Sequence, residues 1–317
     1  MKNLLLLSVI LFVSGYTSCA QKSEIYLPRE YRKALKNNTR DLTGAPGEKY
    51  FQNRADYQID AAFDPQTRIL TGNETITYLN NSPDSLKIIV LNIDHDIFKA
   101  GTNRVYEVDA ADLNDGVEVT GVKINGETIA QAPPLWQRDG TEVIVRLQKP
   151  LAPKATLKME LSWNLIHPLK TQMRTGTYDS LSFFIAFWYP RIAVYDDVFG
   201  WDYTQHLGSG EFYNDFGNFD VSMTLPGDYL MWSTGELQNG SELLTPQIMA
   251  RLEKARETAE TVTIASFDEL RKDRVLKPGK TKKWHYKAGN VTDFAFGISP
   301  VYQWDQQYAT LPDGRRV

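Results

Sequence analysis

The sequence contains very little cysteine. Of its 317 residues only Cys19 is a cysteine, so no disulfide can form within the chain. Stability must therefore come from an ordinary hydrophobic core, which a chain of this size can bury. The apolar content of 42% and the aromatic content of 12% lie well above the levels of disordered chains, and a folded protein is expected.

The sequence also lacks a strong charge of either sign. Its formal net charge is -4 and it contains no long basic run. Proteins that bind phosphate backbones or anionic lipid surfaces usually carry a basic patch. The sequence therefore predicts no nucleic-acid partner.

Apolar runs long enough to cross a membrane are absent as well. The longest, Leu4–Val13, is broken only by Ser8 and follows the positive charge of Lys2. It is shorter than the about 20 residues that span a bilayer, and its position is typical of a secretory signal. We expect export to the periplasm or the cell exterior, although a buried N-terminal helix is an alternative.

Small side chains follow the apolar run. Ser18 and Ala20 suit signal peptidase, which predicts a signal peptide over residues 1–20 and no transmembrane segment after its removal. A lipid anchor on Cys19 is the alternative, although Tyr16 occupies the position where lipoprotein signals usually carry leucine.

Alternation of apolar and polar residues dominates the chain after a polar lead-in over residues 21–53. A period of two residues is typical of half-buried strands, and Asn125–Gly126 suits a tight hairpin. The predicted fold class is mainly β, a large antiparallel β-sandwich. The predicted strands are Tyr57–Ala61, Ile69–Leu79, Leu86–Ile93, Val122–Ile124, Glu127–Ile129, Val143–Leu147, Leu157–Trp163, Phe219–Leu225, Tyr229–Trp232 and Trp284–Tyr286.

One or two short helices interrupt the predicted strands. Thr245 is placed to cap a helix with Pro246 in its first turn, and Ile248, Met249, Leu252 and Ala255 form an apolar stripe. We expect this helix to pack on the sheet edge. The spacing of Ser266 and Glu269 predicts a capping box for a second helix.

Two expectations concern the order of the strands and the end of the chain. The segment Tyr229–Trp232 is expected to return beside Phe219–Leu225 after the turn at residues 226–228. The last residues, Tyr308–Val317, resemble a hairpin turn whose second strand is missing, which indicates truncation. No linker or repeat divides the chain.

The histidines give no metal site by sequence spacing. A zinc peptidase motif H-E-x-x-H needs two imidazoles four residues apart with a glutamate between them. His95, His167, His206 and His285 are far apart in the sequence, and none is followed by glutamate. We predict a structural role for each of them and no zinc in this chain.

Other catalytic motifs are equally weak. The segment Gly208–Gly210 has the wrong spacing for a serine-nucleophile elbow and is interpreted as a turn. Asp196 and Asp197 are adjacent, so on extended backbone their side chains point in opposite directions and cannot share a proton. The sequence predicts no catalytic residue.

The segment from Phe183 to Asp220 is dense in aromatic residues and carboxylates. The aromatic residues are either the walls of a groove for a peptide or glycan, or packing residues that fix a long loop on a sheet. Both interpretations remain open from the sequence. The aromatic residues concerned are Trp188, Tyr189, Tyr195, Phe199, Trp201, Tyr203, Phe212, Tyr213 and Phe216, and the carboxylates are Asp196, Asp197, Asp202, Glu211 and Asp215.

Several motifs in this region, taken in order, resemble one family. Together they are similar to the N-terminal saddle domain of bacterial aminopeptidase N-like zinc metallopeptidases of peptidase family M1, the gluzincins. The match spans roughly residues 50 to 305. The matching segments are Tyr57–Asp60, Leu70–Gly72, Phe187–Arg191, Ala193–Asp197, Gly208–Val221, Leu225–Tyr229, Ser233–Leu237, Trp284–Tyr286 and Asp293–Phe296.

The resemblance implies a parent enzyme that removes N-terminal residues from peptides. It places the β domain at residues 54–305 and the start of a link to a missing C-terminal catalytic domain at 306–317. In the family, zinc is bound in that catalytic domain, so no zinc or catalytic residue can be transferred to this chain, which alone should be inactive. The family's N-terminal domain offers a side chain to the substrate's free amine from the segment before Trp188. Phe187 cannot accept such a hydrogen bond, and the substrate-binding residue stays unknown.

A second hypothesis comes from a different class of protein. The chain could be a free-standing exported module that binds a peptide or glycan through the aromatic loop. Replacing Trp201 or Tyr203 by alanine would then abolish binding.

Overall fold

The computed structural model describes residues 26–170 and 174–317. The signal peptide and the lipid-anchor prediction for Cys19 lie outside the described residues. The chain forms two compact units, one ending at Tyr50 and the other spanning Phe51–Val317. The first unit contains helix α2 (Arg29–Lys36), which was not predicted. Only Ala34 of this helix is buried.

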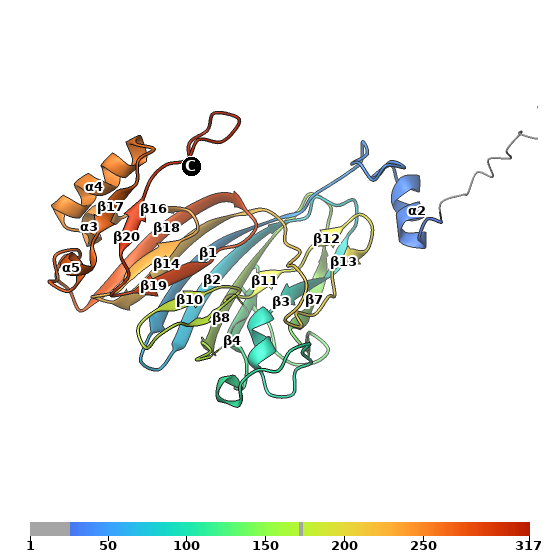
Figure 1. The fold of residues 1–317 in the computed structure, drawn as a ribbon. Coiled ribbons are helices and arrows are strands. Elements are labelled where there is room, and N and C mark those ends of the chain that lie inside the picture. Colours follow the sequence, from blue (N-terminus) through green and yellow to red (C-terminus); the bar gives the residue numbers. More distant parts are fainter. Residues whose placement is uncertain (1–25, 171–173) are drawn as a thin grey trace, which may run out of the picture. The chain divides into compact units, whose positions relative to one another are not determined.

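The second unit is built on a sheet of eight strands in the order β16-β18-β14-β1-β2-β8-β4-β5 (Figure 1). Along its long strands every second residue is buried, as in β2, where Leu70, Ile76 and Tyr78 alternate with exposed threonines. The eight strands are β1 (Arg54–Asp64), β2 (Ile69–Leu79), β4 (Glu118–Ile124), β5 (Glu127–Thr128), β8 (Thr156–Ile166), β14 (Gly217–Pro226), β16 (Glu236–Leu237) and β18 (Thr281–Val291).

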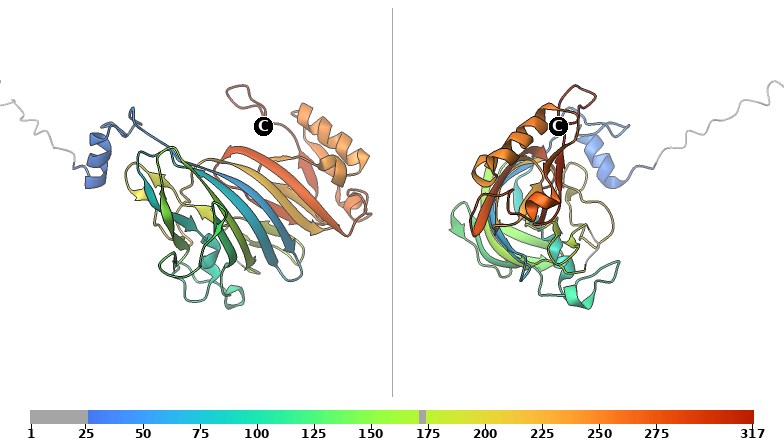
Figure 2. Two further views of the ribbon diagram at one scale, coloured as in Figure 1. Left: turned by 180° about the vertical axis from the view of Figure 1, so that it is seen from behind. Right: turned by 60° about the vertical axis from the view of Figure 1, so that its left-hand side comes forward.

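Two four-stranded sheets cover one face of the large sheet and leave its other face open (Figures 1 and 2). One has the order β15-β19-β10-β9 and the other β11-β3-β7-β6. The first comprises β15 (Leu230–Ser233), β19 (Phe296–Ser299), β10 (Phe183–Ile185) and β9 (Gly176–Thr177). The second comprises β11 (Arg191–Ile192), β3 (Leu86–Asn92), β7 (Glu142–Leu151) and β6 (Trp136–Asp139). The predicted fold class, a mainly β sandwich, is confirmed.

Smaller elements complete the unit. Two strand pairs are formed by β12 (Tyr195–Asp196) with β13 (Gly200–Trp201) and by β17 (Val262–Ala265) with β20 (Trp304–Gln306). The helices are α3 (Gly240–Leu243), α4 (Pro246–Glu257) and α5 (Phe267–Leu270), with 3₁₀ turns η2 (Asp94–Phe98) and η3 (Ala110–Asp112). The structure therefore has more helices in its described residues than the one or two predicted.

Several local predictions are confirmed. Strands β1 and β2 pair in antiparallel register over their full length. Asn125 and Gly126 have φ angles of 50° and 85°, which are the positive values that a type I′ hairpin requires. The capping box at the start of α5 is present, because the Ser266 side chain accepts from the Glu269 backbone and Glu269 bonds back.

The large sheet contains one parallel pair, β1–β14, beside its antiparallel pairs. Two predictions are wrong. Strand β15 pairs with β19 and not with β14, because β1 and β18 already occupy both edges of β14. Helix α4 begins at Pro246 as predicted, but the Thr245 hydroxyl donates to the Arg274 carbonyl and does not cap it.

The end of the chain also differs from the expectation. Thr310 pairs with Arg316, and Ala309 and Val317 exchange two backbone hydrogen bonds of 2.7 and 2.8 Å. The hairpin therefore has both of its arms. Helix α4 packs against β17 of the small β17–β20 pair and not on an edge of the large sheet.

Candidate functional site

A cavity of about 760 Å³ in the second unit is the strongest candidate for a functional site. We call it the acidic cavity. Ligand pockets typically have volumes of about 300–1,000 Å³, so its size fits a small molecule or part of a peptide. Its lining comes from two consecutive stretches of the aromatic segment, residues 199–206 and 209–213, together with Asn92, Asp94, Arg191 and Asp196.

A row of polar side chains crosses the sheet beneath the cavity. Arg191 on β11 is opposite Asn92 on β3, and Asn92 is opposite Glu142 on β7. Residues directly opposite each other in neighbouring strands share one face of the sheet. Because Arg191 and Asn92 line the cavity, the side chain of Glu142 lies on the face that carries it.

Arg191 anchors one end of this row through buried ion pairs. Its Nη2 donates to Asp94 Oδ2 at 2.5 Å, and its Nη1 lies 3.5 Å from Asp293 Oδ2. The guanidinium also lies 4.7 Å from the ring centre of Phe212. Burial raises the pKa of Asp94 to about 6, although the Arg191 charge opposes that rise. The ion pairs fix this wall of the cavity to the sheet.

Glu142 is the buried acid of the row. Its residue is 4% exposed, and its Oε1 has no hydrogen-bond partner among the described residues. Burial raises its pKa to about 7, and the nearby charges of Asp202, Asp139 and Asp94 raise it further. The carboxyl group is therefore close to half protonated at neutral pH.

Asp196 lines the cavity, and its charge acts on Asp215. Asp196 Oδ1 accepts from the backbone of Val198 and Phe199 at 2.9 and 2.6 Å, and its Oδ2 accepts from the Tyr213 hydroxyl at 3.2 Å. Burial, with a smaller contribution from the Asp196 charge, raises the pKa of Asp215 to about 7. Asp197 is buried and does not line the cavity.

Some aromatic residues of the segment pack in the core, and others line the cavity. Trp188, Tyr189 and Trp201 are buried at 1%, 3% and 7% exposure, and they pack in the core. Phe199 and Tyr203 are 73% and 50% exposed and line the cavity. Packing and groove lining are both present, in different residues.

The histidines do not form a metal centre. Burial lowers the pKa of His95 to about 4 and that of His167 to about 3, so both are neutral at physiological pH. His206 lines the cavity, and its pKa is also lowered to about 4, mainly by burial. His285 lies elsewhere, with its Nε2 2.7 Å from Asp220. Across residues 26–170 and 174–317, no group of three potential ligands could hold a metal ion.

The other sequence candidates have structural roles. Gly208 and Gly210 have φ angles of 87° and 86°, which only glycine adopts readily, so this segment is a turn as predicted. Phe187 is buried, and its ring lies 5.3 Å from His206 and 5.4 Å from Phe212. It supports the wall of the cavity from behind.

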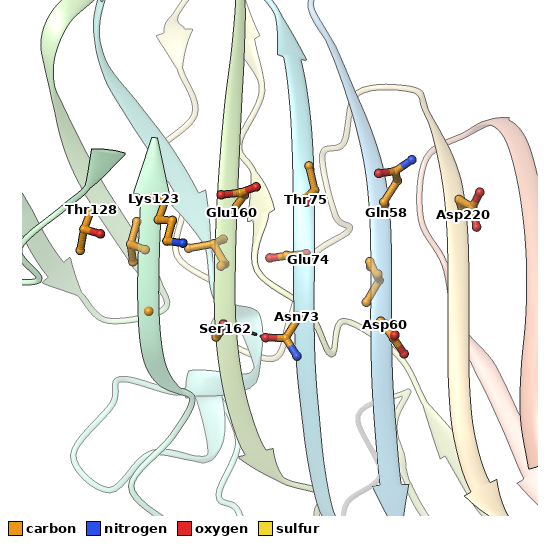
Figure 3. A pocket seen from close by; sticks show the side chains of 14 residues that line it. Gln58, Asp60, Asn73, Glu74, Thr75, Lys123, Thr128, Glu160, Ser162 and Asp220 are labelled. Carbon is orange, nitrogen blue, oxygen red and sulfur yellow. Dashed lines mark hydrogen bonds between the residues drawn. The ribbon is translucent and has the colours of Figure 1, made fainter. Parts of the chain in front are cut away.

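A second hollow of about 580 Å³ lies on the open face of the large sheet (Figure 3). Its polar side chains come from neighbouring strands, and Ser162 donates to Asn73 at 2.7 Å. Asp60 is paired with Lys283, and Asp220 with His285 and Lys287. No aromatic residue lines this hollow, and most of its carboxylates already have partners. The acidic cavity is the better candidate.

Neither the acidic cavity nor the buried acid Glu142 could be predicted from the sequence. Glu142 stands at the start of a predicted strand, where a single carboxylate is unremarkable. Polar residues also end the neighbouring strands β3 and β6, and together with Glu142 they could have indicated a polar site. This pattern can be recognised only when the pairing of the strands is known.

Comparisons with known proteins find similarity among solved structures. No family model matches the chain, and no curated protein matches it. Among solved structures, the chain is similar to an M1 zinc metallopeptidase from Deinococcus radiodurans, in a variant bound to a Tyr-Ser-Ala substrate, with 13% identity and a TM-score of 0.47. The match covers 86% of this chain and 48% of that one.

Two further structures give the same result. A second structure of the same Deinococcus radiodurans variant has 13% identity and a TM-score of 0.42, covering 80% of this chain and 44% of that one. Legionella pneumophila aminopeptidase A, in complex with aspartic acid, has 11% identity and a TM-score of 0.41, covering 88% and 24%. The chain thus spans less than half the length of each of these enzymes.

The structure contains no helix, within its described residues, that is long and apolar enough to cross a membrane.

Proposed function

We propose that this chain is the N-terminal, non-catalytic β domain of an exported M1 zinc metallo-aminopeptidase. The parent enzyme would hydrolyse N-terminal residues from peptides, with zinc bound by its catalytic domain. The observation that carries this proposal is the ordered set of family motifs from Phe187 to Leu237. In the fold these motifs include β12, β16 and much of β14, and they contribute Arg191, Asp196 and residues 209–213 to the lining of the acidic cavity.

The motifs have a physical role in the fold. The Trp188 indole donates to the Phe294 carbonyl at 2.9 Å, and the Tyr189 hydroxyl donates to Asp293 at 2.8 Å. Arg191 forms the buried ion pairs, and Phe212 stacks on its guanidinium. The motif residues therefore hold the cavity wall in place. In the proposed parent enzyme, this wall would face the peptide substrate.

The decisive experiment is to sequence the gene beyond the codon for Val317. An H-E-x-x-H motif within the next domain length is expected, because zinc and the general base need those residue types at that spacing. A stop codon or an unrelated domain would refute the proposal. The purified chain should also release no amino acid from aminoacyl p-nitroanilides, with or without added zinc.

Export is a separate part of the proposal. It rests on the apolar run Leu4–Val13 and the small residues before Gln21. Fusing residues 1–30 to a reporter that folds only after export should give reporter activity, and retention inside the cell would contradict export. In the same fusion, Cys19→Ser should leave the reporter unanchored if Cys19 carries lipid and should change nothing if it does not.

A second candidate function is a free-standing module that binds peptide or glycan. The observation that favours it is the exposure of Phe199, Tyr203 and Tyr213 around the acidic cavity. Tyr203→Ala is the informative variant, because this side chain is half exposed. Trp201 packs against Tyr195 and Tyr78, so its replacement would disturb the fold and would not test binding.

A further inference from the structure

The acidic cavity has an excess of negative charge that its own residues do not neutralise. Its lining contains the carboxylates Asp94, Asp196, Asp202 and Glu211 but only one guanidinium, that of Arg191. The Arg191 charge is shared between Asp94 and Asp293, and Glu211 is held by both terminal nitrogens of Arg174 at 2.8 and 2.6 Å. Asp196 and Asp202 are left without a cationic partner in the described part of the chain.

Glu142 adds a buried acceptor to this set. It is more than nine-tenths buried, it lies on the face of the sheet that carries the cavity, and its Oε1 has no partner among the described residues. A buried carboxyl oxygen without a hydrogen bond is unfavourable unless a ligand or water satisfies it. Its position opposite Asn92, which lines the cavity, places this unsatisfied group directly behind the lining.

Aromatic faces accompany the carboxylates. Phe199, Tyr203 and Tyr213 line the cavity and are at least half exposed. A cation gains attraction from the face of an aromatic ring, and it gains charge-assisted hydrogen bonds from carboxylates. A neutral sugar would leave the negative charges without compensation, and an anion would be repelled by them.

We propose that the acidic cavity binds the cationic side chain of a peptide, a lysine ammonium or an arginine guanidinium, with Asp202 as its carboxylate partner and the nearby charge of Glu142 behind the lining. The volume of about 760 Å³ leaves room for the residues that flank such a side chain. The inference requires neither export nor a catalytic domain. It can therefore fail while the proposed function holds, and the reverse is also possible.

The site carries a distinct pH signature. The groups whose charges act on Glu142 are Asp94, Asp139 and Asp202, all acidic, and its pKa in the free protein is about 7. A bound cation favours the ionised form, so binding removes the proton that Glu142 holds below its pKa. Affinity should rise between pH 6 and pH 8, and binding should release protons. His206 is neutral throughout this range, since its pKa is about 4.

The test is isothermal titration calorimetry of the purified protein with paired tripeptides. One carries a central arginine, and the other carries citrulline, its neutral isostere, with both termini blocked in each. We expect the arginine peptide to bind about tenfold or more tightly, a difference that one charge-assisted contact supplies. Equal affinities, or no binding of either peptide, would overturn the proposal. Spermidine serves as a third ligand, and tighter binding of spermidine than of the arginine peptide would overturn the assignment to a peptide.

Variants locate the site. Asp202→Asn should weaken binding of the arginine peptide severalfold without affecting the citrulline peptide. Glu142→Gln should in addition abolish the pH dependence and the proton release, which titrations in two buffers of different ionisation enthalpy measure. Asp60→Asn, in the hollow on the open sheet face, is the matched control and should bind normally. If Glu142→Gln does not fold, the Asp202 variant and the citrulline comparison still decide the question.

Discussion

The buried pairing of Arg191 with Asp94 gives the sharpest test of what holds the cavity wall. Both residues are at most 5% exposed, and the Nη2–Oδ2 distance is 2.5 Å. Replacing Arg191 by methionine keeps much of the side-chain volume but leaves Asp94 without its cation. Breaking one partner of a buried pair typically costs about 3–5 kcal/mol, because the other charge stays buried. Against a total stability of about 5–15 kcal/mol, such a loss is large.

The effect should depend on pH in a predictable direction. The pKa of Asp94 in the folded state is about 6, above its ordinary value, so the folded state binds the extra proton. Its contribution to stability therefore declines as the pH rises from about 4 to about 6. Without Arg191 the folded pKa rises further, so that decline continues to higher pH. The cost of Arg191→Met should be larger at pH 8 than at pH 5.

Urea unfolding followed by tryptophan fluorescence measures this cost at each pH. The control is the same substitution in an Asp94→Asn background, where the charge is absent and the cost should fall by more than half. A loss below about 1 kcal/mol at pH 8, the range of exposed ion pairs, would refute the argument that burial controls this pair. An equal loss in the Asp94→Asn background would refute it as well.

Three other substitutions test the sheet and its helices. Gly72→Ala should destabilise the protein by about 1–3 kcal/mol through overpacking, because a Cβ there would lie 2.3 Å from the Trp163 ring. Gly121→Ala should be tolerated, because the added Cβ would meet nothing closer than 3.7 Å. Chemical denaturation compares the stabilities of the two variants. Glu74 is 3% exposed, neither of its carboxyl oxygens has a partner among the described residues, and burial raises its pKa well above the ordinary value. Wild-type stability should therefore fall as the pH rises from about 5, and Glu74→Gln should flatten that dependence in pH-resolved melts. Ser266→Ala should cost about 1 kcal/mol through loss of the capping box, and an unchanged melting temperature would show that α5 does not depend on its cap.

The alternation of apolar and polar residues predicted most of the long strands, because each has one solvent-exposed face and one buried face. Strands β2, β8 and β14 follow from alternation alone, and the Asn125–Gly126 turn follows from its backbone preference. Pairing between distant strands could not be predicted in the same way. The parallel β1–β14 contact joins residues more than 150 positions apart. No local sequence pattern indicates that β14 pairs with β1 while β15 pairs with β19.

The candidate site was predictable only in part, for the same reason. The aromatic segment was visible as composition, but the sequence could not separate buried Trp201 from exposed Tyr203, two residues away. Whether such a ring is exposed depends on the sheet that it meets. Glu142 gave no signal at all, because its significance comes from lying opposite Asn92 and near Asp202.

The acids beside the acidic cavity favour a binding role over a purely structural one, because their surroundings disfavour the ionised form. Burial and like charges raise the pKa of Glu142 and Asp215 to about 7, so both carboxyl groups are held in surroundings that disfavour their ionised form. A ligand that binds only the folded state adds stability in proportion to RT ln(1 + [L]/Kd), about 2.7 kcal/mol at one hundred times Kd. If a cation is the ligand, its stabilisation should be greatest above pH 7, where it relieves charge that the empty cavity must otherwise carry. A ligand-induced rise in melting temperature that is larger at pH 8 than at pH 6 is therefore expected for the arginine peptide and not for its citrulline counterpart.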